Sequence, residues 1–254
     1  MNQAIIMTSF GTSVPQAQED IAAVERAMAA SAPEYRCVRA FTSPTIRKKL
    51  AAQGTQVPSL TQALEQLRCE GVKQVTVQPT HLLYGFEYDQ LKAQAQAVAP
   101  GFQALHVGRP LLADTGDLLT FADGLCRTYP VQGNSAVVFM GHGTGHFANA
   151  VYPALQTALT LKGRADLYVA TVEGWPALSD WLPQLAGRSV RLVPLMLVAG
   201  EHAKNDMAGS DPDSWKSRLE QAGCQVCCTM TGLGGLDWVQ QMYCQRLREI
   251  LSEQ

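Results

Sequence analysis

The sequence contains an internal repeat, and this repeat constrains the fold more than any single segment does. Residues 4–13, AIIMTSFGTS, align without a gap on residues 136–145, AVVFMGHGTG, at an offset of 132. Two further matches follow in the same order: residues 39–44 align on 169–174, and residues 77–87 align on 192–202. Shared turn chemistry of β-loop-α units is the alternative explanation. Three ordered matches favour two similar lobes, which we expect over residues 1–125 and 126–254.

Apolar runs typical of buried strands alternate with segments of helical spacing along the whole chain. Helices are predicted over 15–31, with Pro15 at the start, and over 59–70, with Ser59 as N-cap and Gln62 as its capping-box partner. The predicted strands lie near residues 3–9, 35–41, 73–80, 102–107, 135–141, 165–172, 189–198 and 224–230. This alternation predicts an α/β fold in which each lobe is a parallel sheet flanked by helices.

The composition excludes several classes of partner. At 254 residues and 46% hydrophobic content, the chain can bury the cores of two half-sized lobes. A net charge of -2 provides neither a basic field for nucleic acid nor a polybasic membrane anchor. We find no secretory signal and no apolar run of the roughly 18–20 residues that cross a membrane, so we expect a cytoplasmic protein. A homo-oligomer is left open, because one sequence does not set the number of subunits.

The seven cysteines are odd in number and dispersed, which favours reduced thiols over a disulfide framework. Residues 224–228, CQVCC, have a C-x-x-C spacing. The second pair that a structural zinc or iron–sulfur site needs is absent nearby. We therefore interpret this segment as a strand that carries thiols.

Three potential metal ligands follow the ends of predicted strands in the second lobe: His142 in VVFMGHGT, Glu173 in ATVEGW and His202 in AGEHAKND. The carboxyl ends of parallel strands meet at the ligand crevice of an open α/β sheet, so these side chains are expected to converge. Two imidazoles and one carboxylate suit Co(II), Fe(II), Ni(II) or Zn(II) rather than Ca(II) or Mg(II), and they leave positions open for a substrate.

Each of these residues also has a structural interpretation, because a histidine at a strand end is often a hydrogen-bonded loop residue. The glycines near all three residues favour a functional role, since glycine allows unusual backbone angles and the close approach of a ligand. His146 does not complete an H-E-x-x-H zinc motif and more simply supports the site or the substrate. His81, opposite Met196 in the repeat, suits a structural, a substrate-facing or a ligand-supporting role.

The glycine-rich segments match no nucleotide-binding or hydrolase motif. FGTS and GHGT lack the pattern of a phosphate loop and of a dinucleotide fold, and no G-x-S-x-G nucleophile elbow occurs. Nucleotide binding and serine hydrolysis are therefore disfavoured.

Five segments together resemble a known family. They are SFGTS at 9–13, QPTHLLYGFEYDQL at 78–91, MGHGTGHFANAVY at 140–152, TVEGWP at 171–176 and LMLVAGEHAKNDMAGSDPDSW at 195–215. The chain resembles the anaerobic sirohydrochlorin cobaltochelatase family of cobalamin biosynthesis, whose members are single-chain class II chelatases. The similarity spans nearly the whole sequence.

The resemblance implies two α/β lobes with a tetrapyrrole cleft between them, and ATP-independent insertion of Co2+ into sirohydrochlorin without a tightly bound cofactor. Carried over by motif, His142, Glu173 and His202 bind the incoming metal. The family's aspartate before the last histidine is Glu201 here, which preserves the charge. Two pyrrole protons must leave, so we expect His142 to be the principal proton acceptor, His202 a second base, and Glu173 the anionic ligand.

Sirohydrochlorin carries many carboxylates, so Arg, Lys and backbone N–H groups at helix starts are expected to contact it. Thr12, Ser13 and Thr144 are candidates. Glu87 is expected either to guide metal and accept protons or simply to satisfy a helix N-terminus. Insertion of Fe2+ for sirohaem, or non-catalytic carriage of metal or tetrapyrrole, are the alternative functions. The ligand set also accepts Fe2+ or Ni2+.

Overall fold

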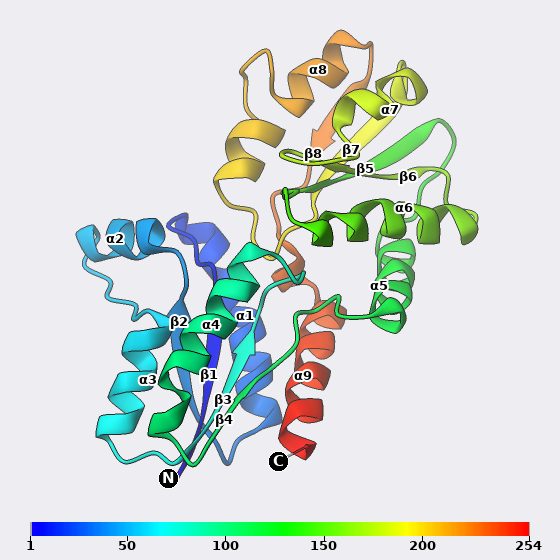
Figure 1. The fold of residues 1–254 in the computed structure, drawn as a ribbon. Helices are drawn as coiled ribbons and strands as arrows, with labels where there is room; N and C mark the ends of the chain where they lie inside the picture. Colours follow the sequence, from blue (N-terminus) through cyan, green and yellow to red (C-terminus); the bar gives the residue numbers. More distant parts are fainter. Residues whose placement is uncertain (1, 254) are drawn as a thin grey trace. The chain divides into compact units, whose positions relative to one another are not determined.

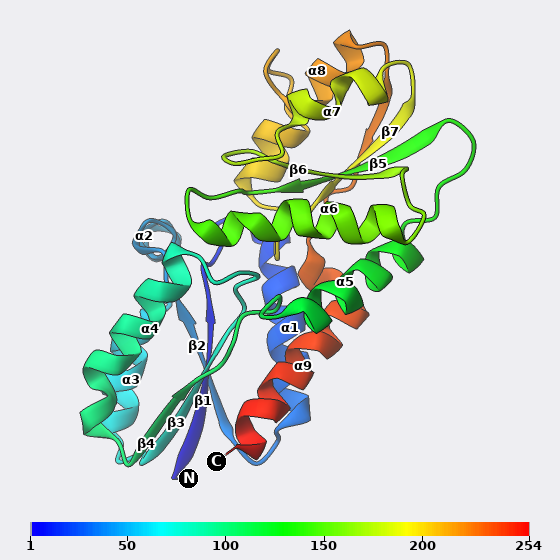
Figure 2. The same ribbon diagram turned by 45° about the vertical axis from the view of Figure 1, so that its right-hand side comes forward.

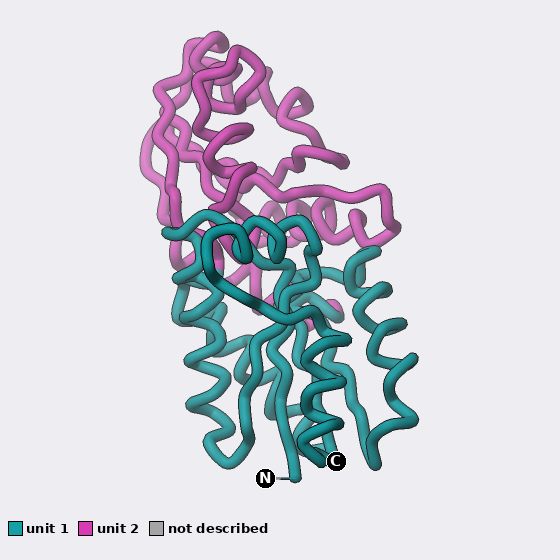
Figure 3. The backbone as a smooth tube through the Cα atoms, turned by 90° about the vertical axis from the view of Figure 1, so that its left-hand side faces the viewer, with its two compact units in different colours: residues 1–113, 234–254 teal, residues 114–233 magenta. Residues whose placement is uncertain are grey.

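The computed structural model describes residues 2–253, which form two compact units (Figure 3). The first unit is Met1–Ala113 together with Gly234–Gln254, and the second is Asp114–Leu233. No helix in the described range is both long and apolar enough to cross a membrane.

The first unit is built on a four-stranded parallel sheet with the order β2-β1-β3-β4 (Figure 1). Helices α3 and α4 cover one face, where leucines and alanines pack on β1, β2 and β3. Helices α1 and α9 pack together on the other face (Figure 2). Its elements are β1 (Gln3–Ser9), α1 (Pro15–Ser31), β2 (Arg36–Phe41), α2 (Pro44–Ala52), α3 (Leu60–Cys69), β3 (Gln74–Pro79), α4 (Phe86–Val98), η1 (Ala99–Gly101), β4 (Ala104–Val107) and α9 (Asp237–Ser252).

The second unit repeats this plan with the strand order β6-β5-β7-β8. Helices α7, α8 and the π-helical turn η3 pack on one face of the sheet, and α5 and α6 pack against each other on the opposite side (Figure 2). Its elements are α5 (Thr115–Thr128), β5 (Ser135–Gly141), η2 (Phe147–Ala150), α6 (Val151–Leu161), β6 (Leu167–Thr171), α7 (Leu178–Leu185), β7 (Ser189–Pro194), η3 (Ala203–Met207), α8 (Trp215–Gln221) and β8 (Gln225–Cys228). The 3-10 turn η4 (Leu233–Gly235) leads the chain back to the first unit.

The predicted fold class is confirmed, since both sheets are parallel, have equivalent strand orders and carry helices on both faces. All eight predicted strands are present, and Ser59 and Gln62 form the predicted capping box of α3. The predicted strand over 189–198 ends at Pro194, where the chain turns away after a last bond from Leu195 N–H to Met140 O. Residues 225–228 of the CQVCC segment form strand β8, and the cysteines of the segment are free.

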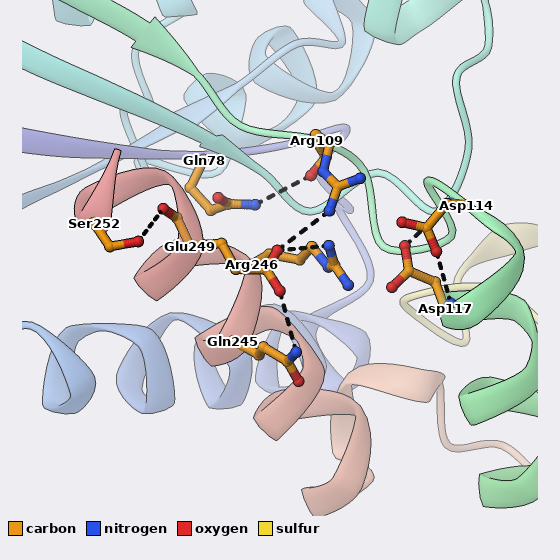
Figure 4. Close-up of polar contacts among 8 residues, drawn as sticks. All are labelled: Gln78, Arg109, Asp114, Asp117, Gln245, Arg246, Glu249 and Ser252. Atoms are coloured by element: carbon orange, nitrogen blue, oxygen red, sulfur yellow. Dashed lines mark hydrogen bonds and ion pairs between the residues drawn. The ribbon is translucent and has the colours of Figure 1, made fainter. Parts of the chain in front are cut away.

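The compact units do not follow the predicted division at residue 125, which falls inside α5. Helix α5 belongs with α6, because Lys162 pairs with Asp123 at 2.6 Å and Arg164 donates to the carbonyl of Cys126. The capping box of Asp114 and Asp117 begins this helix directly where the second unit starts (Figure 4).

The last helix, α9, returns to the first unit instead of completing the second. The Tyr243 hydroxyl donates to the carbonyl of Thr80 at 2.7 Å beneath the end of β3. Glu249 accepts from Arg109 at 3.3 Å and from the nearly buried Arg246 at 2.6 Å (Figure 4). A sequence repeat reveals equivalent βα units but not such an exchange of the final helix, so the predicted C-terminal boundary did not anticipate it.

Candidate metal centre

Three predicted ligands lie together at the carboxyl end of the second sheet. His142 follows β5, Glu173 follows β6, and His202 comes after β7, and these three strands are neighbours (Figure 1). One ligand atom from each side chain lies within 4.8 Å of the others. His142 and Glu173 are exposed, and His202 is half-buried. The strand order therefore produces the convergence that the sequence predicts.

Backbone hydrogen bonds beyond the strand ends hold Glu173 beside His142. The N–H of Val172 donates to the carbonyl of Gly141 at 3.0 Å, and the N–H of Glu173 donates to the carbonyl of His142 at 2.8 Å. The β5–β6 pairing is thus extended by two residues into the loops. The Glu173 carboxylate lies 4.0 Å from His142 Nδ1.

The glycines around His142 make room for protein atoms. Gly143 has a φ of +82°, and a Cβ there would lie 2.6 Å from the backbone nitrogen of Gly174. A Cβ on Gly141 would lie 2.3 Å from the ring of Tyr152. The Tyr152 hydroxyl accepts from the N–H of Gly143, and burial raises the pKa of this phenol. The two glycines therefore allow the backbone at Gly174 and the ring of Tyr152 to lie close to the loop that carries His142, and these contacts fix the position of the loop.

The Nδ1 atoms of both histidines are engaged, which leaves Nε2 as the lone-pair donor. His202 Nδ1 lies 2.6 Å from the carboxylate of Asp206, four residues later on the helical turn that includes η3. His142 Nδ1 lies 2.8 Å from the carbonyl of Gly143. Both acceptors require Nδ1–H, and this fixes the tautomer that offers Nε2 to a metal. The two rings meet edge to face, with centroids 4.7 Å apart.

Chemically, this arrangement suits a divalent transition metal in transit. Two neutral imidazoles and one carboxylate are intermediate to hard donors that suit Co(II), Fe(II), Ni(II) and Zn(II). Three protein ligands leave coordination positions open, as working metal sites require and structural sites do not. The exposure of His142 and Glu173 leaves those positions accessible.

Comparison with known proteins agrees with this chemistry. The sequence profile of the cobalt chelatase (CbiK) family matches residues 3–252. The chain belongs to this family. It is 37% identical to the sirohydrochlorin cobaltochelatase of Salmonella typhimurium, over 99% of this chain and 97% of that protein. It is 36% identical to sirohydrochlorin cobaltochelatase CbiKC of Nitratidesulfovibrio vulgaris, over 91% of this chain and 84% of that protein.

The fold of this chain also resembles that of a solved structure. SirB from Bacillus subtilis with Fe3+ matches with a TM-score of 0.68, covering 98% of this chain and 95% of that one. The two sequences are only 17% identical, so this likeness concerns the fold alone.

The residues that are predicted to contact the substrate are divided between the two units. Thr144 follows His142, and its hydroxyl accepts from the N–H of His146 at 3.1 Å. In the first unit, buried Thr12 accepts from the N–H of Val14 where α1 begins, and Ser13 is half-buried. These hydroxyls organise their own loops, and their contact with substrate stays a prediction.

Glu87 and His81 lie near each other in the first unit. Glu87 is exposed in the first turn of α4, and its carboxylate lies 4.0 Å from His81 Nε2. The His81 ring is nearly buried, and neither ring nitrogen has a hydrogen-bond partner among the described residues. Burial lowers the pKa of His81 to about 4, so its imidazole is neutral near pH 7.

Two residues beside the ligands were not found by sequence reasoning. Asp206, which orients His202, lies at the i+4 position of a helical segment, and this spacing could have revealed it. Asn149 contacts the loops of both His142 and Glu173, and no spacing rule indicates such a contact. His146 supports the adjoining turn, because its Nδ1 accepts from the N–H of Ala148.

Proposed function

We propose that this protein is a sirohydrochlorin cobaltochelatase that inserts Co2+ into sirohydrochlorin without ATP, in cobalamin biosynthesis. The observation that carries the proposal is the convergence of His142, Glu173 and His202 at the ends of three adjacent strands. Membership of the cobalt chelatase family, and the activity named for the Salmonella typhimurium relative, support the same reaction. Co2+ and the free macrocycle give the cobalt macrocycle and two protons.

In this proposal the ligand trio holds Co2+ before transfer. Nε2 of His142 and of His202 and one oxygen of Glu173 bind the ion, and the carboxylate offsets one of its two positive charges. The remaining positions accept pyrrole nitrogens as water leaves. Asp206 fixes the orientation of His202 throughout.

The histidines also receive the two pyrrole protons. When the ion passes to the macrocycle, the Nε2 lone pairs that bound it become free to accept protons. We assign His142 as the principal acceptor, because its side chain is 47% exposed against 38% for His202. His202 is the second base, and its imidazolium is stabilised by Asp206.

The finer substrate assignments are part of the same proposal. Thr12, Ser13 and Thr144 are proposed to contact the carboxylate arms of sirohydrochlorin, and Glu87 is proposed to guide metal or accept a proton. Co2+ is taken as the metal substrate, with Fe2+ and Ni2+ as competitors that the ligand chemistry allows. A cytoplasmic location is proposed from the odd and dispersed set of cysteines.

An anaerobic insertion assay tests the proposal. Protein at low concentration is mixed with excess sirohydrochlorin and Co2+, and the absorption spectrum is followed against a sample without protein. We expect many equivalents of product per protein, and faster insertion of Co2+ than of Fe2+. Conversion that stops at one equivalent would identify a carrier instead. Faster insertion of Fe2+ would identify a sirohydrochlorin ferrochelatase.

A further inference from the structure

Asn149 bridges the two loops that carry His142 and Glu173. Its Oδ1 accepts from the N–H of Thr144 at 3.1 Å, and its Nδ2 donates to the carbonyl of Trp175 at 2.7 Å. Thr144 lies two residues after His142, and Trp175 lies two residues after Glu173. One side-chain amide therefore contacts both ligand loops just beyond the ligands.

The Asn149 side chain is closely packed, and its backbone is anchored in helical structure. Gly174 leaves room for the amide, because a Cβ there would lie 2.4 Å from Asn149 Oδ1. Asn149 itself lies in η2, where its N–H donates to the carbonyl of His146 at 3.0 Å, and η2 runs directly into α6. The amide is thus carried by a short turn that leads into α6, and α6 packs on β6.

Of the three ligands, Glu173 depends most on its backbone for its position. The structure gives its carboxylate one ionisable neighbour among the described residues, His142 at 4.0 Å, and its side chain is 59% exposed. His202, by contrast, is oriented by Asp206. The loop must therefore place Glu173. It is held on one side by the Glu173 N–H bond to His142, and on the other by Asn149 and by the bond from Thr171 N–H to the carbonyl of Pro176 at 2.7 Å.

The first unit offers an internal comparison. Continuing the 132-residue offset of the repeat puts Ala17 opposite Asn149, and alanine has no amide with which to bridge loops. Ser43, which stands opposite Glu173, is instead the N-cap of α2. The side-chain bridge therefore occurs in the unit that carries the ligand trio.

We infer that Asn149 is a positioning residue that holds the Glu173 carboxylate in register with the two imidazoles, an inference that rests on the proposed metal-inserting function. Polar groups that orient metal ligands typically contribute 10-fold to 100-fold to metal affinity. Without the bridge, the Glu173 loop samples other positions, and the ion is held mainly by the histidines.

The test measures Co2+ binding by the full-length protein without tetrapyrrole. We expect Asn149→Ala to raise the Kd for Co2+ by about 10-fold or more and to alter the visible absorption of bound Co2+, which reports its coordination. Asn149→Asp is nearly isosteric and keeps the acceptor for Thr144 N–H, but it cannot donate to the Trp175 carbonyl. It is expected to raise the Kd as well, because a carboxylate oxygen then faces the Trp175 carbonyl, and the retained bond to Thr144 guards against loss of the fold.

Gln156→Ala is the matched control. Gln156 also bridges two backbone groups in the same unit, since it accepts from the N–H of Val169 at 2.7 Å and donates to the carbonyl of Leu167 at 3.1 Å. These contacts lie on α6 and β6, away from the ligand loops. We expect this variant to lower the melting temperature while the Kd and the spectrum of bound Co2+ stay as in the wild type.

Wild-type Kd and spectrum in Asn149→Ala would overturn the inference, as would an equal loss of affinity in Gln156→Ala. The insertion assay on the wild type separates this outcome from failure of the proposed function. A wild-type protein that binds Co2+ but inserts none contradicts the proposed function, while the Kd comparison still decides the role of Asn149. A wild-type protein that binds no Co2+ contradicts both.

Discussion

The two units have the same backbone at their strand ends but different side chains there. In the first unit, Ser43 N–H donates to the carbonyl of Phe10 at 3.2 Å, and in the second, Glu173 N–H donates to the carbonyl of His142 at 2.8 Å. The bonds from Thr80 to Thr8 and from Leu195 to Met140 are equivalent in the same way, at 2.8 and 2.7 Å. The repeat supplies a shared scaffold, and the chemistry is set by a few side chains placed on it.

The first unit uses the equivalent positions for local structure. Ser43 caps α2 by accepting from the N–H of Ile46 at 3.3 Å. Phe10 is a partly exposed aromatic residue, and Glu87 lies in the first turn of α4. Leu91, which stands opposite Asp206 at the offset of 115, is a core residue. A strand end of this fold can therefore serve as a helix cap or as a ligand platform with the same backbone path.

The largest contrast is expected between His142 and its counterpart Phe10. His142→Ala removes a proposed metal ligand and the proposed principal base, so the initial rate of Co2+ insertion should fall by about 10²-fold to 10⁴-fold while sirohydrochlorin still binds. Phe10→Ala should leave the Kd for Co2+ unchanged. Full insertion activity in His142→Ala would contradict the assigned role.

Glu173 and Ser43 form the second pair. Glu173→Gln removes the anionic member of the proposed ligand set and should weaken Co2+ binding by about 100-fold, as measured by calorimetry. Ser43→Ala should leave Co2+ affinity intact and lower the free energy of unfolding by about 1 kcal/mol through loss of the N-cap. If both variants lost Co2+ affinity equally, the proposal that the second unit alone supplies the metal ligands would be wrong.

A smaller effect on Co2+ binding is expected at Asp206, whose counterpart in the repeat of the first unit is Leu91. Asp206→Ala should raise the Kd for Co2+ by about 10-fold, because His202 loses its orienting partner but stays in place. Glu220→Ala, which removes an exposed carboxylate from α8, is the control and should have no effect. An unchanged Kd in Asp206→Ala would show that His202 does not need this partner.

A contrast in stability, not in metal binding, concerns His81 and its counterpart Met196. Burial lowers the pKa of folded His81 to about 4, whereas the unfolded chain protonates this residue near 6.5. The unfolded state therefore binds more protons between these pH values, and stability falls as the pH drops through this window. His81→Met should reduce the loss in unfolding free energy between pH 7.5 and 4.5 by about 2 kcal/mol. Parallel losses in denaturant titrations of both proteins would contradict the assignment.

Local patterns predicted most of the scaffold and the convergence of the three proposed ligands. Apolar runs marked every strand, Ser59 and Gln62 marked the start of α3, and parallel strand ends implied that His142, Glu173 and His202 converge. These features follow from periodicity, capping chemistry and sheet geometry, which are all written in short stretches of sequence.

What the sequence did not reveal depends on contacts between distant segments. The return of α9 to the first unit rests on tertiary contacts such as those of Tyr243 and Glu249, whose partners Thr80 and Arg109 are more than 100 residues away. The Asn149 bridge joins loops on either side of α6. Neither contact has a fixed spacing, so no sequence pattern indicates it.

The central claim is that the second unit carries a three-ligand site for the metal substrate. The most direct test is a crystal structure of the protein soaked with Co2+, with the ion located by anomalous scattering. We predict a single ion with Nε2 of His142, Nε2 of His202 and an oxygen of Glu173 at about 2.0–2.2 Å. An ion bound elsewhere, or one that leaves any of these three side chains uncoordinated, would contradict the account.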